Sequence, residues 1–127
     1  MTIKLNHTIV SARDKQVSAG FLAEILGLPA PVPFGPFLVV QLDNDVTLDF
    51  SDTSGKITRQ HYAFLISEAE FDEILGRIRK RELPYWADPS KDRPGKINTR
   101  DGGRGVYFED PGGHLLEILT RPYGSGG

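Results

Sequence analysis

The sequence predicts an α+β fold built from two copies of a strand–helix–strand–strand module. Three observations support it. Segments of alternating polarity begin near His7 and near His61, each segment is followed by a helical pattern, and the two histidines lie 54 residues apart (61 − 7). At 127 residues the chain suits a single domain. We expect that domain at 1–123, with modules at about 1–55 and 56–123 and a flexible glycine-rich tail at 124–127.

The first module begins with an alternating stretch at 3–10, which is typical of a half-buried strand. Ser11 and Asp14 have the spacing of a capping box, so a helix should follow. After a proline-rich connection, two strands are predicted at 37–42 and 46–50. The expected apolar stripe of the helix is Val17, Phe21, Ile25 and Leu28.

The second module repeats this order. Alternation resumes at His61, and Ser67 with Glu70 forms another capping box. A short strand is predicted at 85–86 and a hairpin at 105–120. The expected helical stripe is Phe71, Ile74, Leu75 and Ile78.

Within the hairpin, the Asp-Pro-Gly-Gly sequence at 110–113 supplies the residue types that a tight turn needs. Alternation then places Glu117 between the aliphatic residues Leu115 and Leu119 on one face of the second strand. A carboxylate among aliphatic side chains is costly, so Glu117 should lie at a strand edge, pair with a base or bind a cation. His114 follows the turn directly and lies on the opposite face of the alternating strand from Glu117, so we expect it to face solvent.

Composition narrows the functional classes. A formal charge of -2 without a basic tail argues against a nucleic-acid or membrane partner, and no long apolar run predicts a signal peptide or a membrane span. The chain has no cysteine. It therefore has neither a disulfide nor a thiolate nucleophile, and a bound metal would need His and carboxylate ligands. These features favour a cytoplasmic protein.

The paired histidines suggest a metal site. His7 and His61 each lie in the first strand of a module, while Asp49 and Glu117 each lie in the last. Two imidazoles and one carboxylate form a facial site with open positions on a divalent ion. Taken singly, each histidine is more simply a packed one, and a polar strand face explains Asp49 equally well. The matching positions in two repeats favour the shared site.

Four other residues are candidates for substrate contacts. Tyr107 can donate a hydrogen bond into the pocket, or simply pack on its strand. Trp86 and Phe34 can line an apolar pocket, with core packing as the alternative. The loop at 87–104, which ends in Arg104, carries several cations. They can bind an anionic substrate or a thiol cosubstrate, or lie free in solvent.

These motifs resemble the vicinal oxygen chelate superfamily, which includes glyoxalase I, fosfomycin-resistance thiol transferases, extradiol dioxygenases, methylmalonyl-CoA epimerase and bleomycin-binding proteins. The resemblance rests on Leu-Asn-His7, on Gln-His61-Tyr-Ala-Phe and on the segment from Tyr107 to Glu117, and it covers nearly the whole chain. The final motif is similar to the fosfomycin-resistance and glyoxalase-like branches.

The resemblance implies paired βαβββ modules that form an open, cupped mixed sheet around a divalent metal (Fe, Mn, Ni, Zn or Co). It further implies a homodimer in which His7 of one chain joins His61 and Glu117 of the other. Asp49 falls where glyoxalase I has a carboxylate ligand. An acid-base histidine shortly before Tyr107, as in extradiol dioxygenases, is absent.

The expected function is a glyoxalase-like enzyme in which the metal acts as a Lewis acid on a small substrate, in a lyase, isomerase or thiol-transfer reaction. Glu117 or Asp49 can move a proton, with Tyr107 as a hydrogen-bond donor. The alternatives are a drug-sequestering resistance protein without catalysis, an extradiol-type dioxygenase and a degenerate dimerisation module.

Overall fold

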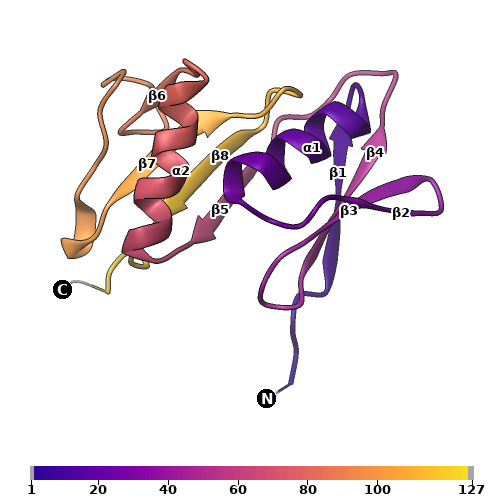
Figure 1. Cartoon of the computed structure of the whole chain (residues 1–127), viewed down its shortest axis with the longest axis horizontal. Helices are drawn as coiled ribbons and strands as arrows, with labels where there is room; N and C mark the ends of the chain where they lie inside the picture. Colours follow the sequence, from indigo (N-terminus) through magenta and orange to yellow (C-terminus); the bar gives the residue numbers. More distant parts are fainter. Residues whose placement is uncertain (1, 126–127) are drawn as a thin grey trace. The chain divides into compact units, whose positions relative to one another are not determined.

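The computed structural model describes residues 2–125, which form two four-stranded sheets, each with one α-helix (Figure 1). The chain divides into two compact units, Met1–Thr58 and Arg59–Gly127. Each unit has the order strand, helix and three strands. This order confirms the α+β class and the βαβββ module that the resemblance implied. Residues 126 and 127 of the expected tail lie outside the described part.

The first unit is a mixed sheet covered on one face by α1. Its strand order is β1-β4-β3-β2, with β1 parallel to β4 and the other pairs antiparallel. Buried Val10, Leu48 and Phe50 from the sheet and Leu22 and Ile25 from the helix form its core. The elements are β1 (His7–Ala12), α1 (Lys15–Leu26), β2 (Val32–Phe34), β3 (Phe37–Gln41) and β4 (Thr47–Asp52).

Four expectations for this unit were wrong in detail. The first strand begins at His7 and continues through Ala12, past the predicted capping residue Ser11. Asp14 caps the helix alone, because its carboxylate accepts from the backbone N–H groups of residues 16 and 17. The proline-rich connection contains β2, an edge strand in which Pro33 is tolerated. The buried helix face is Ser18, Ala19, Leu22, Ala23 and Ile25, whereas Val17 is exposed.

The second unit follows the prediction closely. Ser67 and Glu70 form the predicted capping box, and the whole predicted stripe of α2 is buried. Acidic residues in its first turn and basic residues in its last turn also favour the helix. The strand order is β5-β8-β7-β6, with β5 parallel to β8. The elements are β5 (His61–Leu65), α2 (Glu68–Lys80), β6 (Tyr85–Trp86), η1 (Arg100–Gly102), β7 (Gly105–Glu109) and β8 (Leu115–Leu119).

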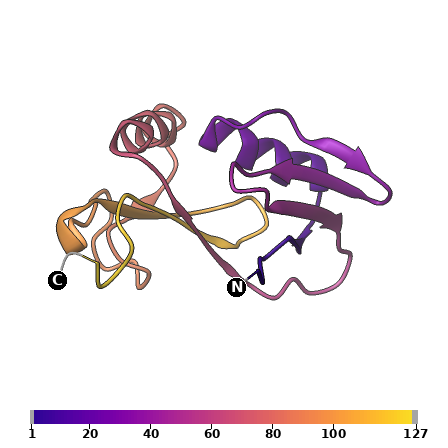
Figure 2. The same ribbon diagram turned by 90° about the horizontal axis from the view of Figure 1, so that it is seen from below.

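In each unit the predicted ligands lie on the sheet face away from the helix. Asp49 pairs in register with Ile9, two residues after His7, and Glu117 pairs with Ala63, two residues after His61. The duplicated acids therefore occupy equivalent places in their sheets. Figure 2 shows α2 over one face of its sheet.

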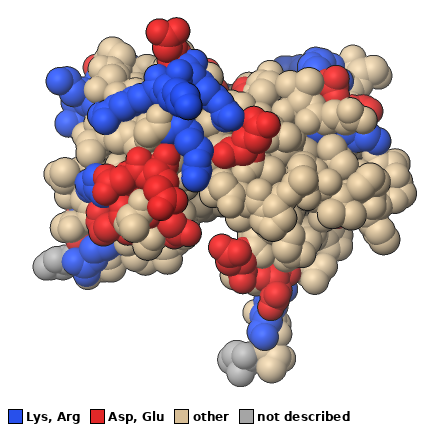
Figure 3. Space-filling model, in the orientation of Figure 1, with Lys and Arg blue, Asp and Glu red and all other residues tan. Residues whose placement is uncertain are grey.

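The loop at 87–104 is tied down by ion pairs. Lys91 bonds Glu109, and Arg93 and Arg100 both bond Asp88. On the face of the second unit seen in Figure 3, basic side chains gather beside a group of acidic ones. Neither α1 nor α2, the α-helices of the described chain, is long and apolar enough to cross a bilayer.

Candidate functional site

The candidate site centres on Glu117, a nearly fully buried carboxylate on the middle of β8. Its side chain is 2% exposed, and its Oε1 lies 3.0 Å from Nε2 of His61 at the start of β5. Parallel pairing of β5 with β8 places the two residues on neighbouring strands and the same sheet face. The first contact predicted from the sequence is therefore present within one unit.

His61 has an oxygen near each of its ring nitrogens. Nδ1 lies 3.2 Å from the backbone oxygen of Leu115, and Nε2 lies 3.0 Å from Oε1 of Glu117. A neutral ring carries one hydrogen, so it donates to one of these oxygens and leaves its other nitrogen as an acceptor. In the tautomer with the hydrogen on Nδ1, Nε2 and Oε1 are both available to a metal ion.

The donor set fits a divalent metal. Metal-bound histidines commonly donate their other ring N–H to a backbone carbonyl, and Leu115 offers such an oxygen to Nδ1 of His61. Nε2 of His61 and Oε1 of Glu117, which are ligand atoms of divalent metals, lie side by side and would hold the ion.

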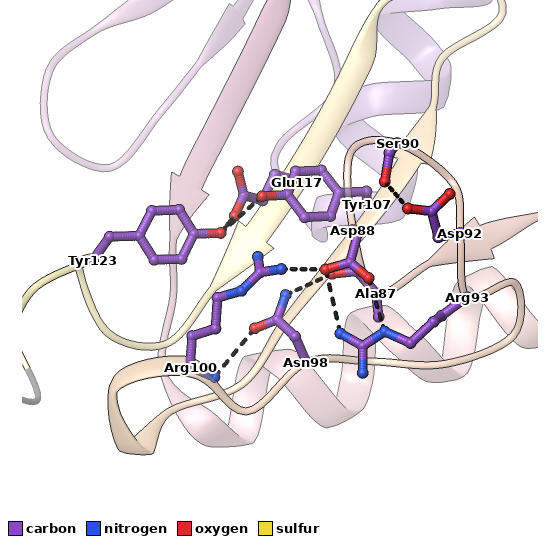
Figure 4. A network of polar contacts seen from close by, with 10 residues as sticks. All are labelled: Ala87, Asp88, Ser90, Asp92, Arg93, Asn98, Arg100, Tyr107, Glu117 and Tyr123. Carbon is purple, nitrogen blue, oxygen red and sulfur yellow. Dashed lines mark hydrogen bonds and ion pairs between the residues drawn. The ribbon is translucent and has the colours of Figure 1, made fainter.

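Two tyrosines complete the surroundings of the carboxylate (Figure 4). The hydroxyl of Tyr123 donates to Oε2 of Glu117, and it lies 2.9 Å from the hydroxyl of Tyr107. Tyr107 is the register partner of Glu117 on β7, and its ring stacks on His61 with 5.9 Å between centroids. The Tyr107 side chain therefore contacts His61 through its ring, and its hydroxyl joins the hydrogen bonds around Glu117.

Burial, followed by the negative charge of Glu117 and a hydrogen bond to it, raises the pKa of Tyr107 to about 12. The charge of Arg100 and a hydrogen bond from it oppose this rise. Tyr107 is therefore protonated at neutral pH and able to donate a hydrogen bond.

A polar network joins this site to the loop at 87–104. Asp88 accepts from both Arg93 and Arg100, and their guanidinium groups lower the pKa of its carboxyl, Arg93 most strongly. Buried Asn98 donates to the backbone oxygen of Ala87 at 2.8 Å and pairs through its backbone with the first residue of β7. The loop is thus held by specific bonds beside the site (Figure 4).

The other predicted ligands lie in the first unit. His7 is exposed at the start of β1, where Nδ1 lies 2.7 Å from the side-chain oxygen of Asn6. Asp49 is buried on β4 and accepts from the hydroxyl of Thr47 at 2.8 Å. Among residues 2–125, no group of three or more His, Asp or Glu side chains is placed to hold a metal. Metal binding by the predicted set stays a prediction.

The predicted substrate contacts occupy varied environments. Arg104 bonds both Glu68 and Asp72 at 2.8 Å, and its guanidinium lies 4.4 Å from the ring centroid of Phe71. It therefore ties α2 to the sheet. Trp86 is half-buried with Lys91 over its ring, whereas Phe34 on the edge strand β2 is 72% exposed. Their contacts with a substrate stay predictions.

The expectation for His114 was wrong, because its side chain is only 1% exposed. Nδ1 accepts from the backbone N–H of Gln60 at 3.0 Å, and the ring makes an edge contact with Tyr62. The alternation that turned Glu117 away from the helix face turned His114 toward the interior. Sequence reasoning also overlooked Tyr123, which follows the last strand in a segment that gave no pattern.

No protein-family model matches the chain. The glutathione transferase FosA of Serratia marcescens is 30% identical over 125 residues, which cover 93% of this chain and 81% of that protein. Its name gives its activity as a thiol transfer, which is the reaction of one of the branches that the motifs resemble. The chain belongs to the vicinal oxygen chelate superfamily.

Two solved structures share more sequence identity with the chain than this transferase does. The oxidase ChaP-H1 is 67% identical, with a TM-score of 0.95, and the match covers 97% of this chain and 99% of that one. The oxidase ChaP-H2 is 65% identical, with a TM-score of 0.97 and complete coverage of both chains. The superfamily assignment from the sequence is confirmed.

Proposed function

We propose that this protein is a metal-dependent oxidase that acts on a small organic substrate. The observation that carries the proposal is its full-length similarity to the two oxidases, whose identity is more than twice that of the glutathione transferase. The His61–Glu117 pair supplies the chemical support, because an imidazole nitrogen and a carboxylate oxygen 3.0 Å apart are two ligands of the predicted metal site.

His61 and Glu117 would hold the metal, with His7 as the predicted third ligand. Two histidines and one carboxylate with open positions are the donor set of non-haem Fe(II) oxygenases. When bound, Fe(II) would supply the electron-transfer chemistry that links an organic substrate to dioxygen.

The chain's own residues prepare this site. The backbone oxygen of Leu115 fixes the ring orientation of His61, and Tyr107 stacks on that ring. Because Tyr123 donates to Glu117, the Tyr107 hydroxyl donates to Tyr123 and offers its oxygen as an acceptor to a substrate hydroxyl. Burial of Glu117 keeps its oxygens away from bulk water and strengthens their interaction with a cation.

The test uses anaerobically prepared protein loaded with Fe(II). Dioxygen uptake is measured with a panel of phenols and hydroquinones, in the wild type and in the Glu117→Gln and His61→Ala variants. Glu109→Gln is the matched control, because Glu109 is a carboxylate of the same hairpin that bonds Arg59 and Lys91 instead. We expect metal binding and uptake in the wild type and control only. Equal metal binding in all four proteins would refute the site.

A second candidate is thiol transfer, which the similarity to FosA supports. Here the metal would polarise an electrophile such as an epoxide while glutathione attacks it. Loss of free thiol, measured with fosfomycin, glutathione and Mn(II), would favour this reaction. Retention of all thiol, together with dioxygen uptake on the phenol panel, would favour the oxidase. A small-molecule ligand whose binding survives chelation would instead favour the drug-sequestering alternative.

The homodimer with ligands shared between copies is tested by complementation. His7→Ala and His61→Ala proteins are each expected to lose metal. If ligands come from two copies, subunit exchange between these variants restores one complete site per mixed dimer. If all ligands come from one copy, the mixture binds no more metal than the separate variants.

A further inference from the structure

The two oxygens of Glu117 have different partners. Oε1 faces Nε2 of His61, and Oε2 accepts from the hydroxyl of Tyr123. A carboxylate free of such a donor can offer a metal either one oxygen or both. Because a phenol occupies Oε2, only Oε1 is directed toward the imidazole.

Tyr123 differs from other contacts of the site in its location. It lies beyond β8, and its side chain is 50% exposed although its hydroxyl reaches a carboxylate that is 2% exposed. One bond ties the segment to the loop at 87–104, because the backbone N–H of Gly124 donates to Asp101 at 3.0 Å. A second bond lies within the segment, where the Arg121 guanidinium donates to the backbone oxygen of Ser125 at 3.1 Å. Figure 4 shows the Tyr123 ring directed at Glu117.

Tyr107 supports the same contact from the opposite side. Its hydroxyl lies 2.9 Å from that of Tyr123, and its own position is fixed by strand pairing and by stacking on His61. The two hydroxyls and the carboxyl group form one hydrogen-bonded chain.

We propose that Tyr123 is a positioning residue of the metal site, which holds Oε2 of Glu117 so that the carboxylate binds the metal through Oε1 alone. This inference rests on the proposed metal site, because it concerns the orientation of a ligand. Hydrogen-bond partners of metal ligands typically contribute about 10- to 100-fold to metal affinity.

The experiment compares full-length wild type, Tyr123→Phe and Tyr85→Phe. The Phe substitution keeps the ring and removes only the hydroxyl. Tyr85→Phe is the matched control, since Tyr85 accepts a bond from Arg79 at 3.0 Å and does not contact Glu117 in the described contacts. Co(II) affinity is measured by calorimetry. Its visible absorption reports coordination number, and melting of the metal-free proteins reports structural damage.

We expect Tyr123→Phe to bind Co(II) about 10- to 100-fold more weakly. Its weaker visible absorption should indicate a higher coordination number, as the freed Oε2 joins the metal. Tyr85→Phe should match the wild type in both measurements. If Tyr123→Phe keeps the Co(II) affinity and the visible spectrum of the wild type, the inference is overturned. The same holds if the substitution changes only the melting temperature of the metal-free protein. The metal site itself would then stand, provided that His61→Ala abolishes binding. A wild type that binds no Co(II) would overturn both proposals.

Discussion

Replacement of Glu117 by Gln tests the metal site through stability. Glutamine has nearly the same volume, its oxygen can still accept from Tyr123, and its amide can donate to Nε2 of His61. The metal-free variant should therefore fold. What it loses is the negative charge that draws a cation to a buried position.

The magnitude follows from binding linkage. A metal present at 100 times its dissociation constant stabilises the folded wild type by about 2.7 kcal/mol. Loss of a metal ligand should weaken metal binding by at least about 100-fold, because even loss of a hydrogen-bond partner of a ligand typically weakens it by about 10- to 100-fold. At the same metal concentration the variant then gains about 0.4 kcal/mol or less. The difference of about 2.3 kcal/mol corresponds to roughly 7–12 °C in melting temperature for a chain of this size.

The assay is thermal melting of wild type, Glu117→Gln and Glu109→Gln with Co(II) and with a chelator. We expect a metal-dependent rise in the wild type and the control, and almost none in Glu117→Gln. An equal rise in Glu117→Gln would show that Glu117 is not a ligand. A wild type without any rise would count against the metal site as a whole.

Three further predictions concern the second unit. Ser67→Ala should lower the free energy of unfolding by about 1 kcal/mol in urea titration, because it removes the helix cap. Gly76→Ala should raise the free energy of unfolding by up to about 1 kcal/mol, since Gly76 lies on the exposed face of α2 and an added Cβ meets nothing within 4 Å. The wild type should melt above Asp88→Asn at neutral pH. Arg93 and Arg100 lower the pKa of Asp88 in the folded state. The stabilisation of the folded protein by ionised Asp88 is therefore complete above the ordinary pKa of 3.8, and it is lost as the pH falls through the lowered pKa of the folded state. A pH-independent difference in melting would contradict that cause.

Much of the fold was predictable because local signals agreed with the tertiary structure. The capping box at Ser67 and the stripe of α2 were both found in the structure, since an apolar stripe must face the sheet. The predicted buried face of α1 was wrong because part of the real one is formed by small residues, namely Ser18, Ala19 and Ala23. A search for large apolar side chains passes over such residues and selected Val17, which is exposed.

The site was predictable to the extent that strand alternation determines it. A period of two placed His61 and Glu117 on one sheet face, and the duplication predicted equivalent places for Asp49 and Glu117. Alternation gives the phase of a side chain but not what covers it. The burial of His114 was missed for that reason, because its partner, the backbone of Gln60, is remote in sequence.

The sequence alone therefore determined the duplicated modules and the face that carries each candidate ligand, because strand and helix periodicities are local properties of the chain. Only the tertiary structure decided that Tyr123 bonds Glu117, that Tyr107 stacks on His61 and that Arg104 is engaged by two carboxylates. These contacts join side chains from separate elements, and their geometry depends on how strands pair and where loops return. No periodic pattern records that information.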